Sequence, residues 1–356
     1  MSHREYLERR TFGSLDGIRA ASILAVIWHH AVPRGVYGLP MFDRGFLGVD
    51  MFFVLSGFLI VTLLLRECDR NGRISLRNFY ARRTLRIFPV YYAVLGALTV
   101  LYLWKPDAGS ASTFFAELPF YATYTSNWVD TTVLALTWSL ATEEQFYLFW
   151  PPVERFLKPL AIPILFGIIG ISQLVNFGFF DAQLADLFGD DAAILPILQV
   201  TFTPICFGVL LARLLHSPRG FQGLARFCGA RFHAPLGLAL VLLACNLPAT
   251  DISGWNRLLI HLTMSYLLVT LVVREDHPLR SLLQWAPIRR VGTISYGMYL
   301  FHIFAVTAAW KILERLSVEG PVAAFVLTTL LTVAVSEVSF RLFENPIMRW
   351  KRRFSS

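Results

Sequence analysis

The sequence has little charge and little cysteine for its length. Only 16% of its 356 residues are charged, whereas soluble chains average about 25%, and 55% are hydrophobic. So few polar side chains cannot cover a soluble globule, and the same composition excludes intrinsic disorder and collagen-like repeats. The 4 cysteines lie far apart without a Cys-x-x-Cys spacing, which excludes a disulfide framework and a zinc knuckle. We therefore expect free thiols and no bound metal.

Signature motifs of several enzyme classes are also missing. The chain has no Gly-x-Ser-x-Gly elbow, no Walker phosphate loop, no His-Glu-x-x-His pair and no dinucleotide fingerprint. These absences argue against hydrolysis by a serine triad, ATP-driven transport and nicotinamide chemistry.

Most of the chain consists of apolar runs long enough to cross a bilayer, which takes about 20 residues. We expect an all-α polytopic integral membrane protein with about ten transmembrane helices, forming a single membrane-embedded domain over residues 1–356. The runs are roughly Leu15 to Val32, Phe46 to Leu65, Ile87 to Trp104, Val133 to Val153, Leu160 to Phe180, Ala192 to Leu215, Ala234 to Leu247, Trp255 to Val273, Ile294 to Leu313 and Pro321 to Phe343. The external segment Lys105 to Thr132 is expected to form a lid or partial helix over an outer cavity.

The basic residues indicate how these runs are oriented. Lysines and arginines that flank membrane spans collect in the cytoplasm. Most of the 32 basic residues fall on the side of the ten runs that also holds both ends of the chain. Both termini are therefore predicted to be cytoplasmic. The net charge of +8 reflects this loop bias and the anionic inner leaflet, so it does not indicate a nucleic-acid partner.

Ionisable side chains inside these runs are candidate functional residues, because lipid makes them costly. Arg19 and His30 are three helical turns apart, so they share one helix face at a separation of about 16 Å. Asp50, near the outer end of the second run, is expected to pair with or orient His30. In the structural alternative, Asp16 and Arg19 neutralise one another and His30 caps the helix. The neighbouring Gly57 is expected to permit close helix contact.

Two further helices carry polar side chains on one face. Arg83 and Arg86 lie one turn apart at an inner helix end, where arginine forks can bind phosphate or merely follow the loop bias. Ser139, Glu143 and Tyr147 are spaced four apart and form one polar stripe. Glu143 is expected to face a cavity or proton path, with a buried ion pair, such as one to Arg19, as the alternative.

A third polar stripe lies in the ninth run. Ser295, Tyr299 and His302 share one helix face, where they can line a substrate channel or form interhelical hydrogen bonds. In the tenth run, Glu344 stands beside a helix-ending proline and is expected to be a structural lock.

Several of these segments together resemble a known family. They are LDGIRAASILAVIWHH, GVDMFFVLSGFLI, RRTLRIFPVYY, TWSLATEEQFYLFWP, ISYGMYLFH and FENP. In this order, over nearly the whole chain, they are similar to the membrane-bound acyltransferase-3 family of O-acyltransferases. The resemblance implies about ten spans and transfer of an acyl group, commonly acetyl from acetyl-CoA, to a hydroxyl of a sugar or other acceptor. The chain looks like the form without a fused esterase-like domain.

The resemblance also implies roles for particular residues. The family's arginine and histidine with ten residues between them fall on Arg19 and His30, and its Arg-x-x-Arg falls on Arg83 and Arg86. Its Trp-Ser-Leu-x-x-Glu begins at Trp138. His30 is then the expected general base, which suits an imidazole. Glu143 or Asp50 is expected to orient His30. The coenzyme phosphates are expected to be bound by Arg19, Arg83 and Arg86. The substrate is expected to contact Ser139, Tyr299 and His302.

The expected partners are acyl-CoA as donor substrate, a hydroxyl of a cell-envelope glycan as acceptor, and the bilayer, with no permanently bound cofactor. The expected location is the bacterial inner membrane. Two alternatives stay open: a secondary transporter that uses Glu143 as a proton carrier, and a non-catalytic membrane scaffold. The sequence does not identify the acceptor, because loops set that choice.

Overall fold

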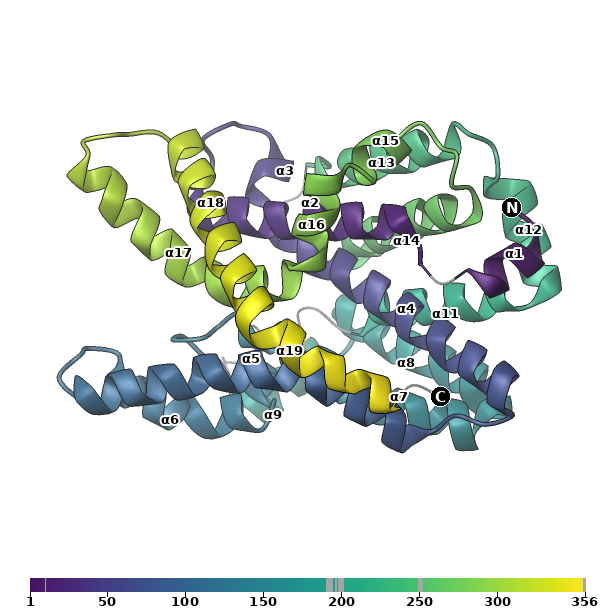
Figure 1. Ribbon diagram of the computed structural model, residues 1–356, viewed down its shortest axis with the longest axis horizontal. Coiled ribbons are helices and arrows are strands. Elements are labelled where there is room, and N and C mark those ends of the chain that lie inside the picture. Colours follow the sequence, from purple (N-terminus) through teal and green to yellow (C-terminus); the bar gives the residue numbers. More distant parts are fainter. Residues whose placement is uncertain (10, 190–194, 196, 198–201, 249–251, 355–356) are drawn as a thin grey trace. The chain divides into compact units, whose positions relative to one another are not determined.

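The computed structural model describes residues 1–9, 11–189, 195, 197, 202–248 and 252–354. Regular secondary structure in these residues is helical, with no strand among them (Figure 1), which confirms the all-α prediction. The chain divides into two compact units, residues 1–66 with 204–340 and residues 67–203 with 341–356. The single membrane-embedded domain over residues 1–356 stays a prediction.

The first unit is built around α2, against which α15, α16, α17 and α18 pack. Ile23, Val26 and Ile27 recur at helical spacing on α2 and are fully buried in these contacts. The helices of this unit are α1 (His3–Glu8), α2 (Gly13–Ala31), α3 (Pro40–Asp43), most of α4 (Gly48–Asn71) and α11 (Thr203–His216), α12 (Pro218–Cys228), α13 (His233–Cys245), α14 (Gly254–Val273), α15 (Arg280–Leu283), α16 (Ala286–Thr293), α17 (Ser295–Arg315) and α18 (Pro321–Ser339), with the 3-10 turn η1 (Gly45–Leu47).

Helix α4 approaches its neighbours so closely that two positions require glycine. A Cβ atom at Gly48 would lie 2.3 Å from the carbonyl oxygen of Ser22 on α2. A Cβ atom at Gly57 would lie 2.0 Å from the carbonyl oxygen of Ile205 on α11. Such distances are far inside van der Waals contact, so the close helix contact predicted at Gly57 is confirmed.

The second unit contains the long helix α5 (Leu76–Trp104). The others are α6 (Ala111–Ala122), α7 (Thr137–Phe156), α8 (Ala161–Asn176), α9 (Asp181–Phe188) and α19 (Asn345–Met348), with the 3-10 turns η2 (Ser126–Trp128), η3 (Lys158–Leu160) and η6 (Arg349–Phe354). A π-helical turn, η5 (Phe340–Glu344), precedes the FENP proline and buries Glu344. This burial agrees with the structural role expected of Glu344.

The segment predicted as a lid or partial helix contains α6, which packs along α5 (Figure 1). The hydroxyl of Tyr91 donates to the carbonyl of Tyr121 at 2.9 Å, and the hydroxyls of Tyr102 and Ser110 are 2.8 Å apart. Tyr121 lies later in the chain than Ser110, but its partner Tyr91 lies earlier in α5 than Tyr102, the partner of Ser110. The segment therefore turns back along α5, which confirms the partial helix.

The carboxylate of Glu117 joins α6 to the start of α7. It accepts hydrogen bonds from the Thr132 amide at 2.8 Å, the Val133 amide at 3.2 Å and the Tyr121 hydroxyl. Burial alone would raise the pKa of Glu117, but these hydrogen bonds outweigh it and lower the pKa. The Glu117 carboxylate thus fixes the segment between α6 and α7.

Six helical segments within the described residues are long and apolar enough to cross a membrane, or seven if the pair α12 and α13, bent by 80°, forms one span. The predicted number of ten spans and the cytoplasmic placement of both termini are not confirmed. Helices α2 and α7 occupy two of the predicted runs. They are not among the six segments, and both carry ionisable residues. The first part of the predicted run Ala192 to Leu215 falls mostly outside the described residues.

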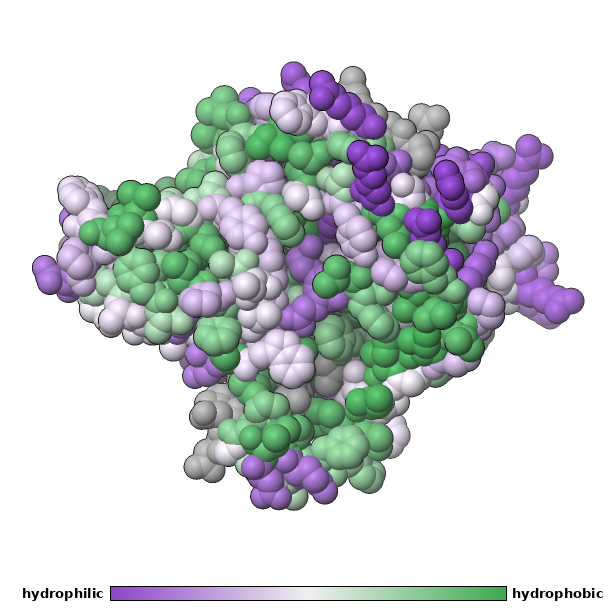
Figure 2. Space-filling model, turned by 90° about the horizontal axis from the view of Figure 1, so that it is seen from below, coloured by the Kyte–Doolittle hydropathy of each residue, from purple (hydrophilic) through white to green (hydrophobic). Residues whose placement is uncertain are grey.

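Large apolar side chains are exposed over many of these helices. On α5, Val100, Leu103 and Trp104 are 67%, 66% and 77% exposed. Figure 2 shows one face of the molecule on which hydrophobic side chains are widely distributed. Water would oppose so much apolar surface, whereas lipid solvates it, so the surface supports an integral membrane protein.

Candidate active site

The two histidines that the sequence predicted from separate runs lie side by side in the first unit. His30 is near the end of α2 and His302 is in α17, and their ring centroids are 5.0 Å apart. His302 is completely buried, whereas His30 is exposed. The pair therefore combines one imidazole that a substrate can reach with a second that lies behind it.

The stripe predicted on α17 is buried in the helix packing. Ser295 and Tyr299 are 7% and 8% exposed, and the carbonyl of Tyr299 accepts a hydrogen bond from Nδ1 of His302 at 2.6 Å. The i, i+4, i+7 spacing correctly predicted a shared face, and the structure shows that this face is buried. Substrate binding by Tyr299, His302 and Ser139 is not tested and stays a prediction.

His29 contacts the segment that follows α2, whereas His30 contacts α17. Its Nδ1 donates to the carbonyl of Asp43 at 2.9 Å, and its ring meets Phe46 edge-on with centroids 5.3 Å apart. His29 therefore holds the connection that follows α2, and His30 alone of the two meets His302 through a described ring contact.

At the other end of α2, Arg19 and Asp16 form the ion pair that the sequence offered as an alternative. Arg19 Nη1 lies 3.7 Å from Asp16 Oδ1. The two residues are three apart in one helix, so they meet without help from a second helix. This contact does not test the proposed binding of coenzyme phosphate by Arg19.

The predicted pairing of Asp50 with His30 is wrong. Asp50 is 1% exposed, and its carboxylate lies 3.4 Å from Arg257 Nη2 and accepts from Nε2 of His261 at 3.1 Å. Both partners come from α14, where they are four residues apart and so face the same way. A buried carboxylate requires a cation and hydrogen-bond donors, and α14 supplies both.

In the second unit, Arg83 of α5 is the centre of a cluster with α7. Its guanidinium lies 3.7 Å from Glu143 and 3.6 Å from Glu144, and 3.8 Å from the centroid of the Tyr147 ring. Glu143 and Tyr147 thus share the predicted helix face. Glu143 thus forms an ion pair with a neighbouring helix, as the alternative for this residue proposed, but the pair is half-buried and its partner is Arg83 and not Arg19. Ser139 Oγ donates to the carbonyl of Leu136 at 3.2 Å.

A cavity of about 350 Å³ adjoins this cluster within the second unit. Its wall combines the ion-paired side chains with aromatic rings and threonines from three segments: Tyr80, Arg83, Thr84, Phe88, Thr123, Tyr124, Thr125, Glu144, Gln145, Tyr147 and Leu148. Tyr124 adopts a positive φ of 54°, and its ring stacks on Tyr91 with centroids 4.4 Å apart. The irregular backbone after α6 thus lines a partly polar cavity.

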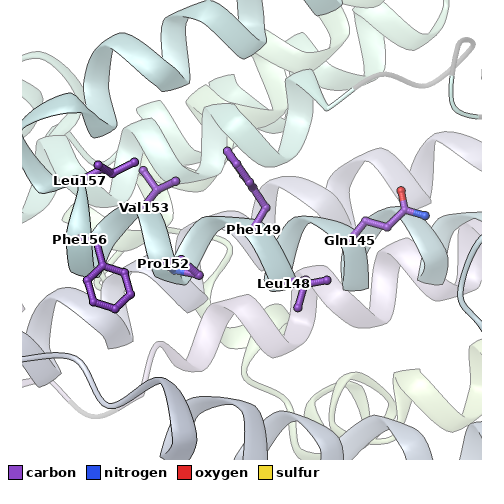
Figure 3. Close-up of a pocket in the computed structure, with 7 residues that line it drawn as sticks. All are labelled: Gln145, Leu148, Phe149, Pro152, Val153, Phe156 and Leu157. Atoms are coloured by element: carbon purple, nitrogen blue, oxygen red, sulfur yellow. The ribbon is translucent and has the colours of Figure 1, made fainter.

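A second hollow, of about 580 Å³, has a different character. Six of the seven lining residues come from α7 and the seventh, Leu157, directly follows it; all but Gln145 are apolar (Figure 3): Gln145, Leu148, Phe149, Pro152, Val153, Phe156 and Leu157. Leu148 and Phe156 are 69% and 64% exposed. A one-sided apolar face of this kind suits contact with acyl chains and offers no chemistry.

A cationic cluster lies at the start of α5. Arg82 forms an ion pair with Glu67 at 2.8 Å and donates to the carbonyl of Phe354 at 2.7 Å. The charges of Arg82, Arg83 and Arg86 all act on Lys351. The predicted pair Arg83 and Arg86 is thus part of a larger basic group. Among the described residues no group of three or more His, Cys, Asp or Glu could hold a metal ion.

Comparison with protein families decides the assignment. Residues 12–340 match the family model for the acyltransferase domain, Acyl_transf_3. The chain belongs to the acyltransferase-3 family. The match includes His30 and His302 of the first unit and the arginine cluster of the second, so the family resemblance noted in separate motifs extends over most of the chain.

Two relatives of this acyltransferase-3 chain carry names that specify a reaction. Peptidoglycan O-acetyltransferase OatA of Listeria monocytogenes is 29% identical over 96% of this chain and 56% of its own length. O-acetyltransferase OatA of Staphylococcus aureus is 27% identical over 96% of this chain and 58% of its own length. The chain therefore spans little more than half the length of these curated relatives. No solved structure matches it significantly.

The sequence predictions for this acyltransferase-3 chain missed Arg257, His261 and Glu117. A signal was available for the first two, because two polar residues four apart in the apolar run Trp255 to Val273 mark one helix face. Glu117 and Tyr121 have the same spacing in α6. What the sequence did not contain was the identity of the facing helix.

Proposed function

We propose that the protein is a membrane-bound O-acetyltransferase of the bacterial inner membrane. In this proposal it moves an acetyl group from cytosolic acetyl-CoA to a hydroxyl of a cell-envelope glycan. Membership of the acyltransferase-3 family supports the reaction class, and the names of the relatives make peptidoglycan the first acceptor to test.

The observation that carries the proposal is the exposed imidazole of His30 backed by the buried His302. A neutral imidazole can take the proton of an acceptor hydroxyl as the oxygen bonds to the thioester carbonyl carbon. The carbon–sulfur bond then breaks, and the proton held by His30 passes to the departing thiolate. The products are an O-acetyl ester and the free coenzyme thiol.

The basic groups are proposed to bind the coenzyme phosphates. In this proposal Arg83 and Arg86 are the phosphate ligands of the second unit, and Glu143 and Glu144 hold the guanidinium of Arg83 in place. Arg19 is proposed as a further phosphate ligand.

The two acidic residues predicted as catalytic have different roles in this proposal. Glu143 is proposed to keep Arg83 in position and to supply negative charge during transfer. A catalytic role for Asp50 has no support from its contacts, since its carboxylate is engaged with Arg257 and His261. In this proposal Asp50 stabilises the packing of α4 on α14.

The test compares His30→Ala with His29→Gln. Purified protein in nanodiscs is given radiolabelled acetyl-CoA and a soluble peptidoglycan fragment, and label in the glycan is counted. We expect His30→Ala to lose on the order of a hundredfold or more in kcat, because general-base catalysis is removed. His29→Gln changes the adjacent imidazole, whose Nδ1 is bonded to the Asp43 carbonyl, and should retain most activity. Native turnover by His30→Ala would refute the assignment of the base.

A further inference from the structure

His302 has an unusual hydrogen-bonding state for a fully buried imidazole. Its Nδ1 lies 2.6 Å from the carbonyl oxygen of Tyr299 one turn earlier in α17. A carbonyl oxygen only accepts hydrogen bonds, so Nδ1 carries the hydrogen in this contact. No carboxylate in the described part of the chain forms an ion pair with His302, so the ring is neutral and its Nε2 carries a lone pair.

That lone pair has no hydrogen-bond donor among the described residues. Buried acceptors are nearly always satisfied, so an unsatisfied one on a fully buried side chain requires an explanation. Packing alone does not supply one, because a phenyl ring would fill the same volume without leaving an acceptor unpaired.

His302 contacts the Tyr299 ring in its own helix and the His30 ring on α2. The centroids of the His30 and His302 rings are 5.0 Å apart, and their planes are inclined by 52°. The charged and titratable groups that act on His30 are His29, Arg34 and His302, none of which is a carboxylate. Among the residues that the structure describes, His30 therefore has no acidic partner of the kind that usually orients a catalytic histidine.

We propose that His302 is a positioning residue for His30, which it holds in one tautomer by accepting a hydrogen bond from a His30 ring N–H at Nε2. The inference rests on the proposed role of His30 as base. With that hydrogen fixed toward His302, the other His30 nitrogen carries the lone pair on the exposed side, where an acceptor hydroxyl can meet it. Catalytic hydrogen bonds are often loose without substrate, and a small rotation of the exposed His30 ring closes this one.

The same contact assists the transfer step. When His30 takes the hydroxyl proton, it becomes an imidazolium, and its hydrogen bond to the neutral acceptor of His302 strengthens. His302 itself neither gains nor loses a proton, and the proton on His30 leaves with the thiolate. Full burial of His302 makes this role a better fit than the direct substrate contact that the sequence predicted.

The first test is spectroscopic and does not depend on activity. Full-length protein with ¹⁵N-labelled histidine is studied by NMR in nanodiscs, and variants at positions 30 and 302 assign two of the 8 histidine rings. We expect His302 as the Nδ1–H tautomer and His30 as a single tautomer. In His302→Phe, which keeps the volume but removes the acceptor, His30 should become a mixture. A His302 ring protonated at Nε2, or a His30 spectrum unchanged in His302→Phe, would overturn the proposal.

The second test is kinetic and uses a matched pair of variants. Gln at 302 places an amide oxygen near the position of Nε2, whereas Phe offers none. We expect His302→Phe to lower kcat on the order of tenfold to a hundredfold with little change in KM for acetyl-CoA, and His302→Gln to recover most of it. Equal turnover in both variants and the wild type would contradict the proposal. If the wild type transfers no acetyl group although the NMR result holds, the proposed function fails and the coupling of the two rings survives.

Discussion

At the scale of single residues, the outcome for each polar side chain depended on whether its partner lay in the same helix. Asp16 and Arg19 meet within α2, and their spacing was enough to predict the pair. Asp50 meets Arg257 and His261 on α14, more than 200 positions away, and no spacing within one run contains that information. The sequence therefore indicated which residues needed partners and failed to indicate which helix supplies them.

The Asp50–Arg257 pair leads to a prediction about stability. Asp50→Ala leaves the buried guanidinium without its carboxylate, so we expect a loss on the order of 3–5 kcal/mol. The double variant Asp50→Ala, Arg257→Met removes both charges and should recover a large part of that loss. Thermal unfolding followed by fluorescence-detected size exclusion gives the comparison. Additive losses in the double variant would show that the two residues do not act as a pair.

At the scale of helices, periodicity and composition predicted where helices begin and end better than they predicted how successive helices are oriented. The runs that became α2, α14 and α17 were placed within a few residues of their observed bounds. The return of α6 along α5 and the 80° bend between α12 and α13 were not predicted. A hydropathy pattern does not encode the contacts of the segments between helices, such as those that Glu117 makes with the segment between α6 and α7.

Close packing of α4 on α11 provides a test at this scale. Gly57→Ala puts a Cβ atom 2.0 Å from a backbone carbonyl, so the helices must separate, and we expect a loss of roughly 1–3 kcal/mol. Gly223→Ala, in α12, meets nothing within 4 Å and should be neutral or stabilise by up to about 1 kcal/mol. The two melting temperatures in detergent are compared directly. A Gly57→Ala protein as stable as Gly223→Ala would contradict the close contact.

At the scale of the whole molecule, the sequence predicted the family and the all-α membrane class because both follow from composition and from motifs spread along the chain. The match to the acyltransferase family over residues 12–340 confirms the first. The predicted number of spans is not confirmed, because the ionisable residues of α2 and α7 weaken the hydropathy signal of these two helices. Residues needed for function thus lower the hydropathy by which a membrane span is recognised.

The central claim is that this chain transfers acetyl groups from acetyl-CoA to a glycan hydroxyl. The most direct measurement gives purified protein in nanodiscs ¹³C-acetyl-CoA and peptidoglycan fragments, and determines the products by mass spectrometry. The account predicts labelled acetyl esters on the glycan, released by mild base, together with an equal amount of free coenzyme thiol. Thiol release without labelled glycan, or no consumption of acetyl-CoA with any envelope glycan, would contradict it.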